Sequence, residues 1–302
     1  MSTVRPVDAR RCQQADSLLE NRLSSFVGDI LNQDKPSDVI RYAFLNLNGI
    51  GSQEERTKYD EIYRFNQVYN VDVFSAVEVN INWFQVPTAQ TIWRKTRGWF
   101  ENQRIIPCWN QLDKSGRKHQ FGGNLLMLQG DIALRAMGAD HDTRRLGRWT
   151  STKLQGKNNC NTRLVSVYVP NNSRYGNQTV YSQHLAGLLS LGIIANPLER
   201  FWEDFWDQID TWLEAGEQLI IGGDWNTNVQ DEGFLLPFRQ RGLYPVLSTS
   251  VITPPETNSR GSNPIDEIFA SSTIDISQCD IDDFLRGLLF RKVVRRSNLV
   301  ST

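Results

Sequence analysis

The sequence predicts a mixed fold of the α/β (α+β) class, built as one continuous domain. Short apolar runs of strand length alternate along the chain with segments whose apolar residues recur at helical spacing. The chain has 302 residues, of which 39% are hydrophobic and 22% are charged, which is ordinary for a globular protein. Its nine tryptophans and fourteen phenylalanines argue against disorder.

Six stretches have the composition of buried strands, with continuous apolar runs bounded by turn residues. They read VIRYAFLN from Val39, VDVFSAVE from Val71, GGNLLMLQ from Gly122, RLVSVYV from Arg163, QLIIGGD from Gln218 and PIDEIFAS from Pro264. A proline-rich segment, which we expect to be a loop, precedes the last of them.

Three segments have helical periodicity, namely 54–70, 180–194 and 197–215. The third has the clearest ends, because Asn196 is a suitable N-cap, Pro197 suits the first helical position and Gly216 suits the end. Its many phenylalanines and tryptophans could form a ligand platform. We expect them instead to face the core, since this spacing is typical of a packed amphipathic helix.

Net charge does not indicate a particular partner, because it is −1 and the isoelectric point is about 6.3. Locally, the segment Arg144–Lys157 contains five basic residues and no acid. We expect such a run to be a solvated face. The alternative is a contact with the backbone of a nucleic acid, whose several phosphates need several cations.

The cysteines indicate a reducing, intracellular setting. They lie far apart at Cys12, Cys108, Cys160 and Cys279, so neither a disulfide framework nor a zinc site is expected. The N-terminal residues lack the apolar stretch of a secretory signal. No apolar run is long enough to cross a bilayer, and no feature indicates a protein partner.

Acids and amides gather where the predicted strands end. They are Asn46 and Asn48, Glu78, Tyr168 and Asn171, Asp224 and Asn226, and Asp266. Side chains at i and i+2 of a strand share one face, so Asp224 and Asn226 would project together if the extended backbone continued past the glycines. Core packing does not require this repetition, whereas ligand sites in open sheets lie outside the carboxyl ends of strands.

The order of these motifs resembles that of the endonuclease/exonuclease/phosphatase superfamily, and within it the endonuclease domain of non-LTR retrotransposons. The matching motifs are Asn46-x-Asn48-Gly49, Glu78, Gly122-Gly123, Tyr168-x-Pro170-Asn171, Gly223-Asp224-x-Asn226 and Ile265-Asp266. They cover about residues 41–271. The resemblance implies a four-layer sandwich, in which two face-to-face β-sheets are flanked by helices.

The resemblance also implies chemistry at a phosphodiester. Two like unit charges about 4 Å apart repel by about 4 kcal/mol near a protein surface, so carboxylates alone would repel a phosphate. A divalent cation reverses the sign of the site, and oxygen ligands favour Mg²⁺ or Mn²⁺ over Zn²⁺. We assign Glu78 as the principal metal ligand and Asn48 as a weaker, water-mediated one.

The remaining residues would act on the water and the phosphate. By resemblance, Asp224 aligns or deprotonates the attacking water, and Asn46 orients the set. Asn226, Asn171 and Tyr168 hydrogen-bond the phosphate oxygens. In the family, Asp266 would fix a final histidine of a Ser-Asp-His motif.

That final histidine is missing here. The histidines are His119, His141 and His184, and none follows Asp266. His119 precedes the paired glycine and could substitute, although a lone histidine is more often structural.

The motifs divide the chain into three parts. They are a peripheral segment at 1–38, in which 15–31 could form a short helix, the superfamily domain at 39–275, and a tail at 276–302. The tail is either truncated or frame-shifted, or a genuine divergence.

Three functions fit these observations. The first is a metal-dependent phosphodiesterase of retroelement type that nicks DNA, which would act in the nucleus. The second is a remnant that binds metal or nucleic acid without cutting, since loss of an acid or base slows turnover by about 10²–10⁴-fold. The third is a phosphatase acting on a small phosphoester.

Overall fold

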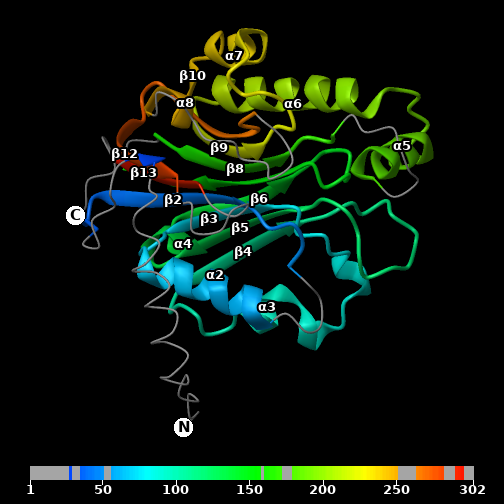
Figure 1. Ribbon diagram of the computed structural model, residues 1–302, viewed down its shortest axis with the longest axis horizontal. Coiled ribbons are helices and arrows are strands. Elements are labelled where there is room, and N and C mark those ends of the chain that lie inside the picture. Colours follow the sequence, from blue (N-terminus) through cyan, green and yellow to red (C-terminus); the bar gives the residue numbers. More distant parts are fainter. Residues whose placement is uncertain are drawn as a thin grey trace.

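Two β-sheets pack face to face and helices cover both outer faces, as Figure 1 shows for the computed structural model. The structure describes residues 27–28, 35–50, 56–157, 160–171, 179–250, 263–281 and 290–295. The predicted fold class, an α/β (α+β) four-layer sandwich, is confirmed. Within the described residues, no helix combines the length and the apolarity needed to cross a bilayer.

The first sheet has seven strands among the described residues. Their spatial order is β1 (Val27–Gly28), β12 (Asp275–Ile281), β13 (Phe290–Arg295), β2 (Val39–Asn46), β3 (Val73–Val77), β5 (Asn124–Gln129) and β4 (Gln103–Cys108). Only β2 and β3 run parallel, and the other neighbours are antiparallel. The carboxyl ends of β2 and β3 therefore lie at the same edge.

The second sheet has six strands in the same described parts of the chain. Their order is β10 (Leu243–Pro245), β11 (Asp266–Ser271), β9 (Gln218–Asp224), β8 (Thr162–Tyr168), β7 (Trp149–Leu154) and β6 (Ala136–His141). Here β8 and β9 form the single parallel pair. Each sheet thus contributes one parallel pair whose carboxyl ends can carry polar side chains.

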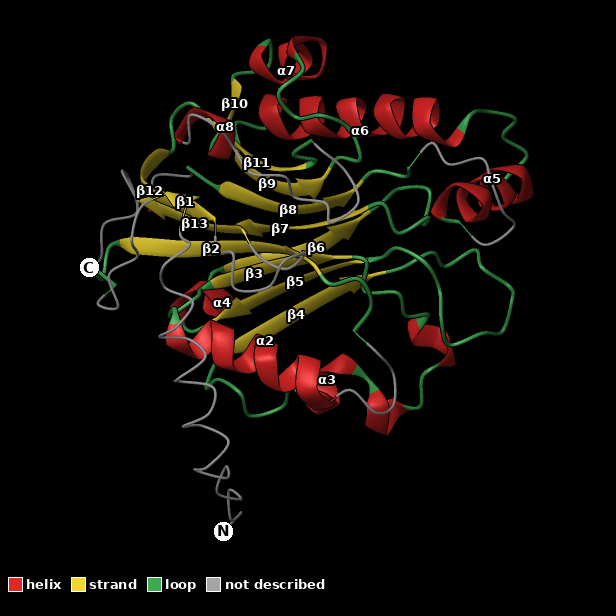
Figure 2. Ribbon diagram, in the orientation of Figure 1, coloured by secondary structure: helices red, strands yellow, loops and turns green. Residues whose placement is uncertain are grey.

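The helices form the outer layers (Figure 2). Their bounds are α2 (Arg56–Val68), α3 (Ile92–Lys95), α4 (Asp131–Leu134), α5 (Val180–Ser190), α6 (Pro197–Glu214), α7 (Glu232–Arg239) and α8 (Leu247–Ser250), with the 3₁₀ turns η2 (Trp83–Gln85) and η3 (Thr88–Gln90). In this view α2 and α3 lie against the first sheet, and α6 and α7 lie against the second.

Three apolar clusters hold the four layers together. The central cluster joins the facing sides of the sheets and includes Phe44 and Leu164. A second cluster packs the outer side of the first sheet on α2, and a third packs the second sheet on α6 and α7. Burial of such apolar surface is the dominant favourable term in folding.

The paired glycines of β9 let the sheets approach closely beside the polar strand ends. A Cβ atom at Gly222 would lie 2.5 Å from the hydroxyl of Tyr42 and 2.9 Å from a ring carbon of Phe44, both on the first sheet. A Cβ at Gly223 would lie 2.8 Å from the ring of Trp225. A side chain at Gly222 would therefore push the sheets apart, and one at Gly223 would displace Trp225 from the third cluster, so both glycines have a packing role.

The six predicted strands are present, with ends that differ by two residues or fewer in most cases. The sequence did not predict the other seven described strands, which are β1, β4, β6, β7, β10, β12 and β13. Strand β7 lies inside the basic run, and its buried Thr150, Ser151 and Thr152 lack the apolar pattern by which a strand is recognised. Helix α5 ends at Ser190 rather than at residue 194, because Gly192 adopts a positive φ of 74°.

Described parts of both chain ends belong to the first sheet. The helix predicted at 15–31 lies outside the described residues except at Val27–Gly28, where the backbone forms strand β1 instead. In the tail, β12 and β13 extend the first sheet, and β13 pairs with β2 along its whole length. The division of the chain at residues 38 and 275 stays a prediction.

Candidate active site

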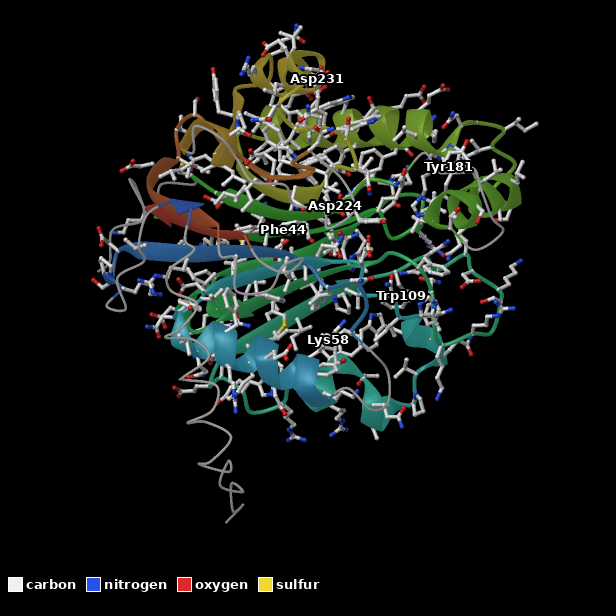
Figure 3. The ribbon with its side chains drawn as sticks, viewed as in Figure 1. Phe44, Lys58, Trp109, Tyr181, Asp224 and Asp231 are labelled. Carbon is white, nitrogen blue, oxygen red and sulfur yellow. The ribbon has the colours of Figure 1, made fainter. Side chains whose placement is uncertain are left out.

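The polar strand ends converge where the parallel pairs of the two sheets meet. Asn46 ends β2, and Glu78 directly follows β3. In the second sheet, Tyr168 and Asp224 stand opposite each other at the ends of β8 and β9. Asp224 also pairs with Asp266, the first residue of β11. Figure 3 labels Asp224 at this edge.

Two hydrogen bonds connect the sheets at this point. The side-chain amide of Asn46 donates to Oδ2 of Asp224 over 2.8 Å. The hydroxyl of Tyr168 donates to Oε1 of Glu78 over 3.0 Å. Each bond joins a residue of the first sheet to one of the second, so residues up to 178 positions apart in sequence form one constellation.

A tight loop after β2 holds Asn48 beside Glu78. The backbone amide of Asn48 donates to Oδ1 of Asn46 over 2.9 Å, and that of Gly49 donates to the carbonyl of Glu78 over 2.7 Å. From helix α2, the ammonium group of Lys58 donates to the carbonyls of Leu47, Asn48 and Gly49 over 3.2, 3.4 and 2.6 Å. The Lys58 ammonium group therefore ties the loop to helix α2.

After β9 the chain turns rather than continuing as a strand. Asn226 has a positive φ of 49°, so the expectation that extended backbone aligns it with Asp224 is wrong. The two residues nevertheless stay adjacent, because the amide of Asn226 donates to Oδ1 of Asp224 over 3.1 Å. The side-chain amide of Asn226 donates to the carbonyl of Val169 over 2.7 Å.

Left-handed backbone is concentrated here. Of the six non-glycine residues with positive φ in the described parts of the chain, four belong to this edge, namely Asn48, Glu78, Asn80 and Asn226. Asparagine tolerates this region, whereas a glutamate rarely adopts it. Such strain costs on the order of 1–3 kcal/mol per residue and clusters at functional sites. The conformation of Glu78, at φ 49°, is therefore an independent sign of function.

The surroundings of Asp224 and Tyr168 raise the pKa values of both groups. Burial, followed by the negative charge of Glu78, raises the pKa of Asp224 to about 7, and hydrogen bonds from Asn226 and Asn46 oppose that rise. Burial and the charges of Glu78 and Asp224 hold the pKa of the Tyr168 hydroxyl well above its ordinary value. Tyr168 therefore stays a proton donor to Glu78 at neutral pH.

The donor set fits a hard divalent cation. Glu78 is half-buried and Asn48 is exposed, so both can reach a solvated ion. Within the described residues, no group of three His, Cys, Asp or Glu side chains is suited to a metal. One carboxylate with an amide is compatible with Mg²⁺, which keeps several waters and uses one or two carboxylates plus substrate phosphates. A cation would also offset the repulsion between Glu78 and Asp224.

Two predicted residues lie at the border of this constellation. Asn171 is exposed, follows β8 and lines a cavity together with Asn226. Asp266 is buried, with 3% of its surface exposed, and lies beside Asp224 in the register of the second sheet. All eight predicted site residues are therefore placed at one edge, although their catalytic roles stay predictions.

None of the histidines is hydrogen-bonded to these residues in the described part of the chain. His119 pairs through its backbone with Ile81, and its ring packs edge-on against Phe121. His141 hydrogen-bonds Thr150 over 2.9 Å. His184 is buried in α5, which lowers its pKa to about 3. Its neutral, buried ring is structural.

The basic run is not an open cationic surface. Arg148 is fully buried between Asp142 and Asp204, at 2.6 and 2.8 Å. Arg144 lies 3.3 Å from the same Asp204, and Lys153 lies 3.6 Å from Glu217. The solvated face predicted for residues 144–157 is therefore wrong for the buried Arg148, whereas Arg145 and Lys157 are exposed and Arg144 and Lys153 are half-buried in ion pairs.

Lys58 contributes to the site but was not predicted from the sequence. No local pattern identifies it, because the segment 51–55 separates it from the loop that it holds, and its role depends on the packing of α2. It also missed the mutual hydrogen bonds of Asn80 and Gly122, each 2.8 Å long. The paired glycine belongs to a motif named above, whereas its adjacency to Asn80 depends on the fold.

No protein-family model and no curated protein sequence matches the chain. Solved structures do. The AP endonuclease LMAP of Leishmania major is 14% identical with a TM-score of 0.61, covering 97% of this chain and 99% of that one. The Neisseria 3′ phosphatase NExo, bound to a product DNA hairpin, is 12% identical with a TM-score of 0.57, covering 85% and 99%.

A third similar structure carries the superfamily name. The endonuclease/exonuclease/phosphatase family protein of Leptotrichia buccalis is 10% identical with a TM-score of 0.50, covering 85% of this chain and 99% of that one. At these identities the likeness concerns the fold, and one fold hosts several activities. The chain therefore has the fold of the endonuclease/exonuclease/phosphatase superfamily, in agreement with the order of its sequence motifs.

Proposed function

We propose that this protein is a divalent-metal-dependent phosphodiesterase that nicks DNA, of the type found in retroelements. One observation carries the proposal. Two carboxylates from different sheets, Glu78 and Asp224, are held at one edge by Tyr168 and Asn46. A structural role alone does not explain why a fold should bury Asp224 next to a second acid, an arrangement in which burial first and the charge of Glu78 second raise the pKa of Asp224.

Asp224 is the proposed base or aligning group for the attacking water. It is 1% exposed, and its two oxygens accept hydrogen bonds from Asn46 and Asn226, so its orientation is fixed. A pKa raised toward neutrality suits a group that takes a proton at physiological pH. Asp266, the buried acid paired with Asp224 in the sheet register, would add to the negative electrostatic environment of Asp224.

Glu78 and Asn48 would hold Mg²⁺ or Mn²⁺. Such an ion polarises a phosphoryl oxygen and neutralises developing charge. Tyr168, Asn171 and Asn226 would hydrogen-bond the phosphate oxygens as negative charge builds on them. Lys58 would keep the loop of Asn48 in place through its three carbonyl contacts.

The absent final histidine supports a second candidate, a protein that binds metal or nucleic acid without cutting. None of the three histidines substitutes for it in the described part of the chain. A third candidate, a phosphatase for a small phosphoester, is supported by the neutralised basic run. Release of inorganic phosphate from nucleotides or inositol phosphates, without nicking of DNA, would favour the third.

A plasmid-nicking assay with Mg²⁺ tests the proposal. We expect the wild type to convert supercoiled plasmid to nicked circles, and Glu78→Gln and Asp224→Asn to lose this activity. The matched controls are Glu101→Gln and Asp131→Asn. Both change exposed acids next to the ends of β4 and β5 that lie at the edge of the sheet away from the site. Nicking that survives both site substitutions would contradict the site assignment.

The same preparation separates an active enzyme from a remnant. If Mg²⁺ raises the melting temperature of the wild type but no nicking occurs, the second candidate is favoured.

A nicking enzyme of retroelement type would act on chromosomal DNA, so we propose a nuclear location for it. Nucleic acid is the one partner that the proposal requires.

A further inference from the structure

The loop after β3 has left-handed backbone at two positions, Glu78 and Asn80. Their φ angles are 49° and 59°. Asparagine tolerates this conformation, whereas a glutamate rarely adopts it. A residue in a sparsely populated backbone region keeps that conformation only when its surroundings hold it there. The contacts of Asn80 therefore bear directly on how Glu78 is held.

Asn80 forms a reciprocal pair of hydrogen bonds with Gly122, the first residue of the paired glycine. The backbone amide of Asn80 donates to the carbonyl of Gly122 over 2.8 Å. In return, the backbone amide of Gly122 donates to Oδ1 of the Asn80 side chain, also over 2.8 Å. The carbonyl of Asn80 accepts a third bond from the backbone amide of Gln120 over 3.3 Å. Both the backbone and the side chain of Asn80 are thus tied to the segment that leads into β5.

On its other side, the loop after β3 is tied to the loop that carries Asn48. The backbone amide of Gly49 donates to the carbonyl of Glu78 over 2.7 Å. A Cβ atom at Gly49 would lie 3.5 Å from the side-chain nitrogen of Asn80. Asn80 therefore lies where the loops after β2 and β3 meet the paired glycine.

Gly122 also contacts the tyrosine that holds the carboxylate of Glu78. A Cβ atom at Gly122 would lie 3.7 Å from Cδ1 of Tyr168, so the glycine lies directly beside this ring. The hydroxyl of Tyr168 donates to Oε1 of Glu78 over 3.0 Å. Asn80 is therefore connected to Glu78 twice, once along the backbone and once through Gly122 and Tyr168.

We propose that Asn80 is a positioning residue for Glu78, and that its side chain keeps the Glu78 carboxylate in the orientation that a divalent cation requires. The inference rests on the proposed function, because it takes from it the role of Glu78 as principal metal ligand. Asn80 acts through Glu78 and is not proposed as a ligand itself. Groups that orient a metal ligand in this way typically contribute about 10–100-fold in metal affinity.

Two substitutions separate the side chain of Asn80 from its backbone conformation. Asn80→Gly permits the left-handed backbone but removes the acceptor of the Gly122 amide. Asn80→Asp retains both, because aspartate also tolerates this backbone region and keeps Oδ1. Mn²⁺ affinity is measured by calorimetric titration without DNA. We expect it to weaken by about 10–100-fold in Asn80→Gly and to be at least that of the wild type in Asn80→Asp.

The matched control is Asn70→Gly. Asn70 also has left-handed backbone, with φ 46°, but it precedes β3, whereas Glu78 follows it. The same change at this opposite edge of the sheet should leave Mn²⁺ affinity unchanged. Melting temperatures in EDTA check that each variant is folded at the temperature of the titration.

Hydrogen exchange of the Gly122 amide, measured by NMR, provides a readout that needs no metal. Its protection should be lost in Asn80→Gly and retained in Asn80→Asp, because only the second variant keeps the acceptor. An Asn80→Asp protein that binds Mn²⁺ tightly without protecting this amide would overturn the inference. The added negative charge, rather than the hydrogen bond, would then explain the affinity.

Wild-type Mn²⁺ affinity in Asn80→Gly would also overturn the inference, as would an equal loss of affinity in Asn80→Gly and Asn80→Asp. Plasmid nicking reports separately on the proposed function. If the variants show the expected order of Mn²⁺ affinities but the wild type never nicks DNA, the endonuclease proposal is contradicted and the role of Asn80 is supported. A wild type that binds no Mn²⁺ would contradict both.

Discussion

The ends of β3 and β9 present two carboxylates in different surroundings. Glu78, after β3, is half-buried, has left-handed backbone and accepts a hydrogen bond from Tyr168. Asp224, at the end of β9, is 1% exposed and held by Asn46 and Asn226. Neighbouring carboxyl groups whose surroundings differ in this way can take different roles. The accessible one is suited to a cation, and the buried one to a water molecule.

Glu78→Gln should have the largest effect. It removes the charge that would hold the cation, and a metal's contribution of several kcal/mol corresponds to roughly 10³-fold in rate. We expect nicking to fall by at least that factor. The Mg²⁺-induced rise in melting temperature should also disappear. A variant that keeps this rise would show that Glu78 is not the principal ligand.

Asp224→Asn should separate the two roles. We expect a loss of about 10²–10⁴-fold in nicking, the contribution of a positioned acid or base. Unlike Glu78→Gln, it should keep Mg²⁺ binding, measured by calorimetric titration, within a few-fold of the wild type. Equal loss of Mg²⁺ affinity in both variants would contradict the different roles proposed for Glu78 and Asp224.

Without divalent metal, Asp224 should make stability depend on pH. Its pKa rises from 3.8 in the unfolded chain to about 7 in the folded protein, so the folded state holds a proton that the unfolded state has released. The free energy of unfolding should therefore fall between about pH 4 and pH 7, by on the order of 2–4 kcal/mol. Urea unfolding at a series of pH values measures this.

The matching control is Asp224→Asn, in which this part of the pH dependence should vanish. Because Asp224 and Glu78 interact, the titration belongs to the pair, and Glu78→Gln should reduce the slope as well. A wild-type protein whose stability rises from pH 4 to pH 7 by the same amount would contradict the raised pKa of Asp224.

Tyr168→Phe tests the hydrogen bond that joins the two sheets at Glu78, and we expect a smaller effect from it. It removes the hydroxyl that donates to Glu78 and leaves the buried ring in place. Groups that hydrogen-bond a metal ligand without binding the metal themselves typically contribute about 10–100-fold in metal affinity or activity. We expect a loss in that range, measured as both nicking rate and Mg²⁺ affinity. An unchanged rate would show that the bridge is structural.

Lys58→Met should have the smallest effect. The substitution retains much of the aliphatic side chain and removes the three hydrogen bonds to the loop of Asn48. We expect Mg²⁺ affinity to weaken by about tenfold, the low end of the range for positioning groups. Lys58→Arg, which can still donate to carbonyls, should recover part of the loss.

The sequence predicts the parts of the fold in which local pattern and burial agree. The strands that end at Asn46 and Asp224 are continuous apolar runs, and Asn196 with Pro197 marks the start of α6. Strand β7 was missed because its buried residues are hydroxyl-bearing, and β6 because its residues are mostly exposed. In both, register with a neighbouring strand decides the structure rather than local composition.

The site follows the same division. Strand-end acids and amides could be named from sequence, because each follows a recognisable strand. The contacts of Lys58 could not, since they depend on how helix α2 packs against the loop after β2. The basic run shows the reverse case, because Arg144 and Arg148 share the carboxylate of Asp204 on the distant helix α6, and Arg148 also pairs with the nearby Asp142.

The position of a bound cation is the most direct test of the proposed division between Glu78 and Asp224. Crystals grown with Mn²⁺ would show the ion by its anomalous scattering. We predict one peak bonded to the carboxylate of Glu78 and adjacent to Asn48, with Asp224 facing it across the edge. A peak elsewhere, or none at saturating Mn²⁺, would contradict the proposal that these separated side chains surround one metal ion.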